Sequence, residues 1–356
     1  MRIVLAGDWQ WDIYEKFCSK ALTHLGHEVI PFQWREFFCG RIGKLQNFIP
    51  FPGPSLAKLN FEFTKLANDT KPDVILVWRG THVLPVTLRK IKQNMQATIV
   101  TYNNDDPFGP AAHDNVPWHH HFKWFWHLRI LKQSDLALVY RPVNAVEAKA
   151  AGAKKVAVLR PYFIPELHKP IKLTEQDRFR YGCDVVFVGH YEPDGRDEYL
   201  RQLVDAGLHV RLFGGGYWTQ SVLGDLADYF GEISPVYGDD YAKALCGAKM
   251  CLCFLSKLNR DTYTRRCFEI PACGRLLLSE RTEELQRLFK EDEEAVFFSS
   301  MEELTEKALW LRDHPQDIER MAQAGMRRVH ADGHSVYDRM KEFLDLVDEV
   351  RAEGVS

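Results

Sequence analysis

The sequence lacks the patterns that assign a protein to a special class. It contains no run of eighteen apolar residues, which excludes a membrane-spanning helix. Its eight cysteines form no C-x-x-C pair and fall mostly in apolar runs, which is typical of reduced thiols in a cytoplasmic protein core. The first stretch, MRIVLAGDWQWD, reaches Asp8 too soon for a signal peptide and predicts a strand instead. We therefore expect a soluble, cytoplasmic protein.

Cofactor and metal motifs are also missing. The loop GDWQWD after the first predicted strand lacks the second and third glycines of the dinucleotide-binding fingerprint, which argues against an NAD dehydrogenase. Cys251 and Cys253 occupy alternate positions of the apolar strand pattern MCLCFL, which buries both rather than forming a metal site. The adjacent His119, His120 and His121 cannot all reach one ion from consecutive helical positions. We expect neither a metal nor a nicotinamide cofactor.

Two successive α/β patterns are present. The 356 residues are enough for two domains with separate cores. A strand at 2–6, a helix at 14–25 and a strand at 28–32 open the first pattern, whereas residues 37–51 are expected to be irregular. A second pattern begins at CDVVFVGH, after a proline-rich and then charged linker at 161–180 that shows no long periodic element. Small ligands preferentially bind between domains, so we expect a cleft there.

Charge is unevenly distributed along the chain, although its net value is only −3. The first 165 residues carry 21 Lys and Arg against 13 Asp and Glu, a net of +8, and the remainder carries 25 against 36, a net of −11. A basic first half favours an acidic partner, such as an anionic glycan, a lipid headgroup surface or a nucleic acid. A nucleic acid is not expected, because no stripe of basic residues with interleaved aromatics extends beyond Lys123 and Arg129.

Polar side chains follow several predicted strands of the first half. Functional groups in an open α/β sheet gather at the carboxyl ends of its strands. The polar run 103–106 is closed by Pro107 and Gly109, and either ligand contact or turn and capping chemistry explains it. The candidates for ligand contact at this edge are Asp8, Arg79, His82, Asn103, Asn104, Asp105, Asp106 and Arg141.

The segment 117–131, PWHHHFKWFWHLRIL, combines three tryptophans with four histidines. At helical spacing its apolar residues fall on two sides, which usually indicates a helix buried in its domain. Two functional alternatives stay open, an aromatic platform for a sugar and an interfacial helix that touches lipid.

The most informative stretch is 259–280, NRDTYTRRCFEIPACGRLLLSE. A polar loop leads into a short helix, RRCFEIPACG, which Gly274 closes, and an apolar strand follows. A helix start offers free backbone N–H groups to an anion, and Arg265 and Arg266 add full charges there. Glu269 lies one turn inside, where its carboxylate can bind a pair of ribose hydroxyls, and Asp261 lies on the loop. The alternative is a solvated charged loop before a buried helix.

An acid, seven residues, then Glu and a small-residue stretch resembles the nucleotide-sugar motif of the GT-B glycosyltransferases, related to family-four retaining enzymes. The wording TYTRRCFEIPACG, with LLLSE and EELQRLF after it, resembles the CgeB-like (spore maturation protein-like) branch. The resemblance is strong over 184–334 and weaker over 101–109. It departs at Asp261, where the wider superfamily has Glu. The fold it implies is α/β, with two Rossmann-like domains facing across a cleft: an acceptor-side domain at 1–165, a nucleotide-sugar domain at 166–334, and a helix at 335–356 that crosses back to the first.

The resemblance also implies roles for individual residues. His190 and Arg196 match the two basic groups that hold the donor pyrophosphate, and the loop around Tyr237 matches the one that meets the base. The expected catalytic residues are Asp261, Arg196, Arg266, His190 and Asp106. The expected donor-binding residues are Glu269, Arg265, Thr262, Tyr263, Thr264, Gly214, Gly215 and Tyr237. The expected acceptor-side residues are Asp8, Arg79, His82, Asn103, Asn104 and Asp105.

The resulting hypothesis is a glycosyltransferase of bacterial glycan biosynthesis. It moves a sugar from a nucleotide-diphosphate donor to the hydroxyl of a glycan, lipid-linked or protein acceptor, with retention and with no metal or cofactor besides the donor. The basic first half adds peripheral contact with the inner membrane surface as an option. The alternatives are a sugar-nucleotide epimerase of the same fold and a non-catalytic scaffold; the charges of Asp261, Glu269 and the arginines argue against a scaffold.

Overall fold

The chain folds into two compact units in the computed structural model, which describes residues 1–112, 116 and 118–353. The first unit comprises residues 1–161 and the helix that begins at Val336, and the second comprises Tyr162–Ser335. The resemblance implies boundaries at residues 165 and 334. Pro117 of the aromatic segment and residues 354–356 of the predicted last helix lie outside the described residues.

The first unit is built on a parallel sheet with the strand order β2-β1-β3-β4-β5-β6. Its strands are β1 (Arg2–Gly7), β2 (Glu28–Gln33), β3 (Val74–Trp78), β4 (Thr98–Asn103), β5 (Leu136–Val139) and β6 (Lys155–Val158). The central strands β1, β3 and β4 are buried on both faces over nearly their whole length, as in sheets that helices cover on both sides. Because all strands are parallel, Asp8, Arg79 and Asn103 meet at one edge.

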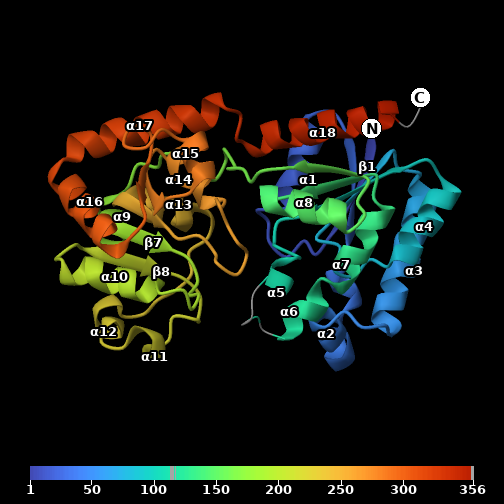
Figure 1. Ribbon diagram of the computed structural model, residues 1–356, viewed down its shortest axis with the longest axis horizontal. Coiled ribbons are helices and arrows are strands. Elements are labelled where there is room, and N and C mark those ends of the chain that lie inside the picture. The colour runs from blue at the N-terminus through green and yellow to red at the C-terminus, as the bar shows by residue number, and fades with distance from the viewer. Residues whose placement is uncertain (113–115, 117, 354–356) are drawn as a thin grey trace. The chain divides into compact units, whose positions relative to one another are not determined.

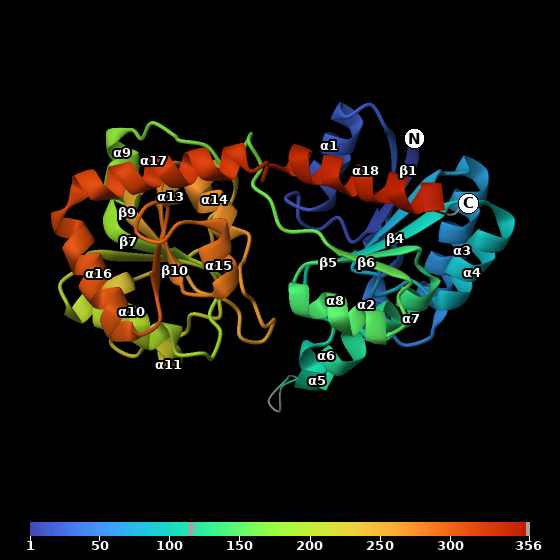
Figure 2. The same ribbon diagram turned by 45° about the horizontal axis from the view of Figure 1, so that its top comes forward.

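Helices pack on this sheet (Figure 1). The longer ones are α1 (Glu15–His24), α3 (Pro54–Thr70), α4 (Pro85–Asn94), α8 (Pro142–Ala150) and α18 (Val336–Glu353). α18, the last helix of the chain, lies against α1 in both views (Figure 1, Figure 2), and the rings of His24 and Tyr337 are 5.1 Å apart. The Lys155 ammonium on β6 pairs with Glu353 at 2.9 Å. The last helix therefore belongs to the first unit.

The prediction of an irregular segment at 37–51 is wrong. The chain forms a short 3₁₀ turn, η1 (Arg35–Phe37), and then a helix, α2 (Gly40–Phe48). Two glycines weaken the helical signal in the sequence. Gly43 is required by packing, because a Cβ there would lie 2.6 Å from the backbone carbon of Phe38.

The aromatic segment forms two short helices rather than one. They are α6 (Trp118–Lys123) and α7 (Phe125–Ile130), preceded by α5 (Gly109–Ala112) and followed by the 3₁₀ turn η2 (Leu131–Gln133). The break falls at Trp124, which is buried between them. α6 leaves Trp118 and Phe122 largely exposed, so the prediction of a helix buried in its domain is wrong for this half of the segment.

The second unit has a parallel sheet with the order β11-β10-β9-β7-β8. Its strands are β7 (Cys183–Val188), β8 (Val210–Phe213), β9 (Ala248–Cys253), β10 (Leu276–Glu280) and β11 (Val296–Phe298). Its helices are α9 (Glu175–Tyr181), α10 (Arg196–Asp205), α11 (Gln220–Leu223), α12 (Leu226–Phe230), α13 (Gly238–Gly247), α14 (Arg266–Ala272), α15 (Glu283–Leu288), α16 (Met301–Asp313) and α17 (Pro315–Ala331). The linker prediction missed α9, a surface helix started by a Thr174–Asp177 capping box.

All eight cysteines are unpaired thiols, and all except Cys39 are buried. Among the helices that the structure describes, none is both long enough and apolar enough to cross a bilayer.

Candidate functional site

The segment between β9 and β10 has the local structure that its sequence predicts. A loop follows β9, α14 begins at Arg266, and Gly274 lies just beyond its end with a φ of 67°, a left-handed conformation that glycine adopts without strain. α14 packs against α17 (Figure 2). Six of its seven residues are buried, Glu269 among them, so this carboxylate needs partners inside the protein.

Glu269 has those partners. Its Oε2 accepts a hydrogen bond of 2.7 Å from the Tyr241 hydroxyl, and its Oε1 accepts one of 2.9 Å from Arg265 Nε. His168 Nε2 lies 3.7 Å from the same Oε1. We call these four residues the Glu269 cluster. They bring the linker, α13 and α14 together.

The cluster holds Glu269 charged. Burial by itself would raise the pKa of this carboxyl, but the charge of Arg265 and the hydrogen bond from Tyr241 outweigh it and lower the pKa to about 2. Burial lowers the pKa of His168 to about 4, so its ring is neutral at pH 7. Its Nδ1 accepts the Ile164 N–H, which leaves the ring proton on Nε2, facing the carboxylate.

Sequence reasoning missed Tyr241 and His168. Glu269 and Arg265, the two cluster residues that the sequence predicted as donor-binding, are within one helical turn of each other. His168 is 101 residues from Glu269 along the chain. The only local signal for Tyr241 is its place one turn after Tyr237, at the start of α13. Only folding brings the linker histidine to the helix.

The loop before α14 holds the other donor-side candidates. Asp261 is half-buried and its N–H donates to Ser256 O at 2.9 Å. The Thr262 hydroxyl oxygen is buried without a hydrogen-bond partner, whereas Tyr263 is a fully buried core residue. Thr264 is half-buried just before α14. Arg266 Nε donates to Val188 O at 2.6 Å, which places the arginine at the carboxyl end of β7.

Arg196 is held by protein groups. It is 4% exposed, and its guanidinium donates to Asp194 Oδ1 at 2.8 Å, to Asp194 Oδ2 at 2.6 Å and to His190 O at 2.8 Å. The His190 ring is largely exposed, and its Nε2 lies 3.2 Å from Glu192 Oε1. Arg196 could bind a pyrophosphate, as predicted, only if these bonds rearranged. The exposed His190 ring could bind one without such a rearrangement.

The glycine run and Tyr237 also have distinct positions. A Cβ on Gly214 would lie 2.2 Å from Gly189 O, so glycine there allows the ends of β7 and β8 to approach closely. Around Gly215 and Gly216 the space is open. The Tyr237 ring is 62% exposed at the start of α13. These residues keep their predicted donor-side roles as untested predictions.

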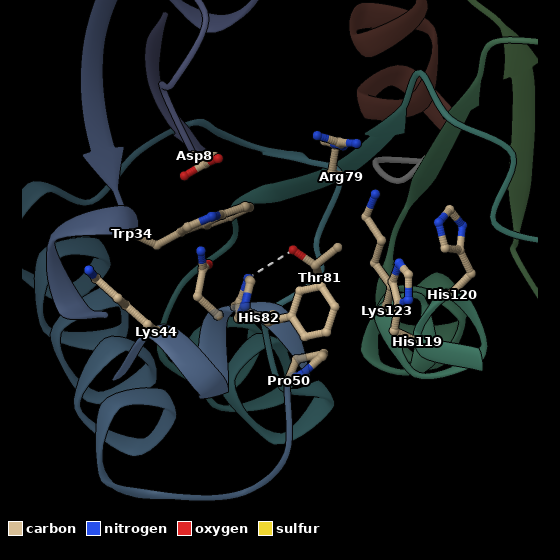
Figure 3. A pocket seen from close by; sticks show the side chains of 12 residues that line it. Asp8, Trp34, Lys44, Pro50, Arg79, Thr81, His82, His119, His120 and Lys123 are labelled. Atoms are coloured by element: carbon tan, nitrogen blue, oxygen red, sulfur yellow. Dashed lines mark hydrogen bonds between the residues drawn. The ribbon is translucent and has the colours of Figure 1, made fainter. Parts of the chain in front are cut away.

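In the first unit three of the six acceptor-side candidates line a pocket of about 440 Å³ (Figure 3). Its lining combines basic, aromatic and polar side chains from β-strand ends, α2 and α6: Asp8, Trp34, Lys44, Asn47, Phe48, Pro50, Arg79, Thr81, His82, His119, His120 and Lys123. The pocket thus contains Asp8, Arg79 and His82 of the predicted set and adds residues of α2 and α6 that the sequence did not assign to it.

Asp8 enters the pocket from a constrained turn. The backbone N–H groups of Asp8 and Trp9 donate to Glu15 Oε1 at 3.0 and 3.3 Å, and Trp9 has a positive φ of 57°. Burial raises the pKa of Asp8, against the opposing charges of Arg35 and Arg79. Its Oδ1 is buried without a hydrogen-bond partner. This oxygen is therefore available to a ligand hydroxyl.

Arg79 and Lys123 lie together on the opposite side of the pocket. Arg79 forms an ion pair with Asp105, and Lys123 Nζ lies 3.7 Å from the same carboxylate. Both cations stand over the Trp124 ring, at 5.7 and 4.6 Å from its centroid. Arg79 has a positive φ of 62°, which is unusual for a non-glycine residue and typical of functional sites.

The other predicted residues at this edge serve the turn itself. Asn103 Oδ1 accepts the Asp105 N–H at 3.0 Å, and Asn104 Oδ1 accepts the Trp78 indole N–H at 3.1 Å. Asp106 Oδ1 accepts bonds from the N–H groups of Phe108 and Gly109 and from Asn144 Nδ2. These contacts give Asp106 a structural role, and its predicted catalytic role stays untested. Arg141 donates to Asn104 O at 3.3 Å.

The fold is shared with several solved structures. A sucrose-phosphate synthase from Thermosynechococcus elongatus is 13% identical, covers 99% of this chain and 100% of its own, and superposes with a TM-score of 0.73. HepE from Anabaena in complex with UDP and glucose is 12% identical over 98% and 100%, with a TM-score of 0.64. The α,α-trehalose 6-phosphate synthase from Burkholderia multivorans is 12% identical over 99% of each chain, with a TM-score of 0.64.

At the level of sequence, residues 196–345 match the model of a family described as glycosyl transferase-like. No curated protein matches the chain. The predicted fold class of two Rossmann-like α/β domains is confirmed by the two parallel sheets and by these structures. The chain therefore has the GT-B fold, and residues 196–345 of it are similar to a glycosyl transferase-like family.

Proposed function

We propose that this protein is a glycosyltransferase that moves a sugar from a nucleotide-diphosphate donor to an acceptor hydroxyl. The observation that carries the proposal is the match of residues 196–345 to a glycosyl transferase-like family on a chain with the GT-B fold. This range contains Arg196, Asp261, Arg265, Arg266 and Glu269. The structure of HepE with UDP and glucose supports a nucleotide-sugar donor for this fold.

The donor site lies at the carboxyl ends of β7 and β9 in this proposal. Glu269 binds the ribose hydroxyls: a carboxylate has about four acceptor positions, and bonds from Tyr241 and Arg265 leave some of them for a ligand. The charge that develops on the departing diphosphate is stabilised by the guanidinium of Arg266 and an N–H of the His190 ring, because preorganised cations and hydrogen-bond donors contribute most where charge grows. Asp261 binds hydroxyls of the donor sugar.

The acceptor site is the pocket of the first unit. Asp8 Oδ1 accepts a hydrogen bond from an acceptor hydroxyl, and His82, whose buried Nε2 has no partner, binds a second polar group. In the transfer the bond between the anomeric carbon and the diphosphate oxygen breaks, the acceptor oxygen bonds to that carbon, and the proton of the acceptor hydroxyl passes to the departing diphosphate. Retention of configuration and independence of metal are part of the proposal.

A binding screen followed by product analysis tests this function. Nucleoside diphosphates and their sugars should raise the melting temperature, because a ligand that binds only the folded state stabilises it. Incubation with the stabilising nucleotide sugar should then yield sugar joined to an acceptor. Free epimerised sugar nucleotide would show the epimerase alternative instead, and no stabilisation by any nucleotide would favour a scaffold.

We also propose that the protein belongs to the CgeB-like branch, acts in the cytoplasm in bacterial glycan synthesis, and contacts the membrane peripherally. The contact surface is formed by exposed apolar residues of α2 and α6, namely Ile42, Leu45, Phe48, Trp118 and Phe122. The rings of Phe48 and Trp118 are 6.5 Å apart, so the two helices share one surface. Arg41 and Lys44 are exposed on α2, and exposed apolar groups together with basic ones suit an anionic bilayer interface. The double variant Trp118→Ala and Phe122→Ala should no longer co-sediment with anionic vesicles. Co-sedimentation equal to that of the wild type would contradict membrane contact through this surface.

A further inference from the structure

The pocket of the first unit is lined mainly by one sign of charge. Lys44, Arg79 and Lys123 are among its lining residues, against a single carboxylate, Asp8. Asp105 lies beside Arg79 and Lys123 and balances one of these two charges. Burial and the proximity of Arg79 lower the pKa of Lys123 to about 7, the expected result when two cations share too few anions.

Three buried polar atoms at this pocket have no hydrogen-bond partner. They are Arg79 Nε, His82 Nε2 and Asp8 Oδ1. Buried polar atoms in folded proteins are nearly always bonded, so three around one pocket indicate groups that a ligand satisfies. Arg79 Nε donates only, whereas Asp8 Oδ1 in a carboxylate accepts only. The ligand therefore needs an acceptor group near Arg79 and a hydroxyl near Asp8.

The two requirements fall on different sides of the pocket. Figure 3 shows Arg79 and Lys123 on one side and Trp34 and His82 on the other, with Asp8 beside Trp34. The exposed ring of Phe48 supplies apolar surface to the pocket, whereas the Trp34 side chain is only 1% exposed and forms its buried wall. His82 is fixed by a 2.8 Å hydrogen bond between its Nδ1 and Thr81 Oγ1, so its free Nε2 has a defined direction.

We propose that this pocket binds a phosphorylated acceptor, with the phosphate at Arg79 and Lys123 and the hydroxyl-bearing part at Asp8, His82 and Phe48. The term acceptor rests on the proposed transferase function, whereas the phosphate site does not. A phosphate monoester carries between one and two negative charges at pH 7 and three acceptor oxygens, which matches two neighbouring cations better than a carboxylate does. Planar guanidinium donors suit it particularly well.

Calorimetric titration of the full chain tests the site, with inorganic phosphate and glucose 6-phosphate as probes and glucose and glucuronate as their uncharged and carboxylate counterparts. We expect glucose 6-phosphate to bind, glucose to bind at least tenfold more weakly, and glucuronate to fall between them. Lys123→Gln should weaken both phosphate probes about tenfold or more, the effect of losing a charged hydrogen bond. Lys123→Arg should restore most of the affinity.

The matched control is Arg129→Gln. Arg129 lies six residues further along the same segment, on the exposed side of α7, and does not line the pocket. The substitution removes the same charge, so a general electrostatic effect would appear in both variants. Equal phosphate affinity in wild type and Lys123→Gln, or equal loss in both variants, would overturn the proposal. Glucuronate binding as tight as glucose 6-phosphate would overturn the assignment to phosphate.

Two further measurements distinguish a lipid-borne from a soluble phosphate, and the phosphate site from the transferase function. Vesicles of phosphatidylcholine with phosphatidic acid offer the same phosphate chemistry on a lipid, and competition between glucose 6-phosphate and these vesicles would identify a lipid-borne acceptor at this site. Vesicle binding unaffected by glucose 6-phosphate would identify a soluble one. Binding of a nucleoside diphosphate to Lys123→Gln reports on the second unit alone. If neither wild type nor this variant binds a nucleoside diphosphate, the proposed transferase function is wrong, whereas the phosphate site is still tested by the titration with glucose 6-phosphate.

Discussion

Replacing Glu269 by Gln removes the buried negative charge of the Glu269 cluster while keeping the size of the side chain. The amide oxygen can still accept from Arg265 Nε, and the amide NH2 can donate to the Tyr241 hydroxyl. The pKa of this carboxyl falls from its ordinary 4.5 to about 2 in the folded protein. At about 1.36 kcal/mol per pKa unit, the charged form gains about 3 kcal/mol of stability from folding. The variant should therefore lose about 3 kcal/mol of unfolding free energy at pH 7.

The pH dependence separates this effect from a packing defect. Because the folded-state pKa is lowered, the stabilisation is complete above pH 4.5, the ordinary value, and is lost as the pH falls toward 2. The gap between wild type and Glu269→Gln should shrink over the same window. A packing defect would persist at every pH.

Equilibrium urea unfolding, followed by circular dichroism at pH 7, 4 and 3, measures this gap. The control is Glu283→Gln: Glu283 pairs with Arg287 across one turn of α15, but both side chains are exposed, and such pairs contribute at most about 1 kcal/mol. Equal stability of wild type and Glu269→Gln at pH 7, or a gap that does not narrow below pH 4.5, would refute the assignment of the low pKa to this cluster.

Three further outcomes are expected. Glu269→Ala should weaken nucleoside diphosphate binding about ten- to a hundredfold, the effect of a charged hydrogen bond; unchanged affinity by calorimetry in the folded variant would refute ribose contact. Asp8→Asn should raise the free energy of unfolding at pH 7 but not at pH 3. Burial raises the pKa of Asp8, so its charged form, which predominates at the higher pH, destabilises the fold. Urea unfolding midpoints at the two pH values measure the difference. Gly7→Ala should lower the free energy of unfolding by about 1–3 kcal/mol, since the new Cβ would lie 2.3 Å from Glu15 Oε1. Gly215→Ala, with open space around it, should change that free energy by no more than about 0.5 kcal/mol. Equal melting temperatures for the two variants would contradict the packing argument.

Local patterns predicted the regular elements well where strong signals agree. The apolar runs at 2–6 and 276–280 are strands, and Gly274 ends the helix that carries Glu269. The prediction failed where one residue type has two uses. Gly40 and Gly43 are typical of loops, yet both lie in α2, and position 43 is glycine because the backbone of Phe38 approaches too closely for a side chain.

The sequence by itself determined the two α/β patterns and most of their strands, the polar residues that follow those strands, and the difference in charge between the two halves. These properties depend on hydrophobic period, capping residues and composition, all of which are local along the chain. Only the tertiary structure decided that Tyr241 and His168 contact Glu269. The same holds for the hydrogen bonds from Arg196 to Asp194 and for the position of Lys123 beside Arg79. Such contacts join residues that are distant along the chain or depend on side-chain direction, and their energies come from burial, which no single segment experiences before the fold is complete.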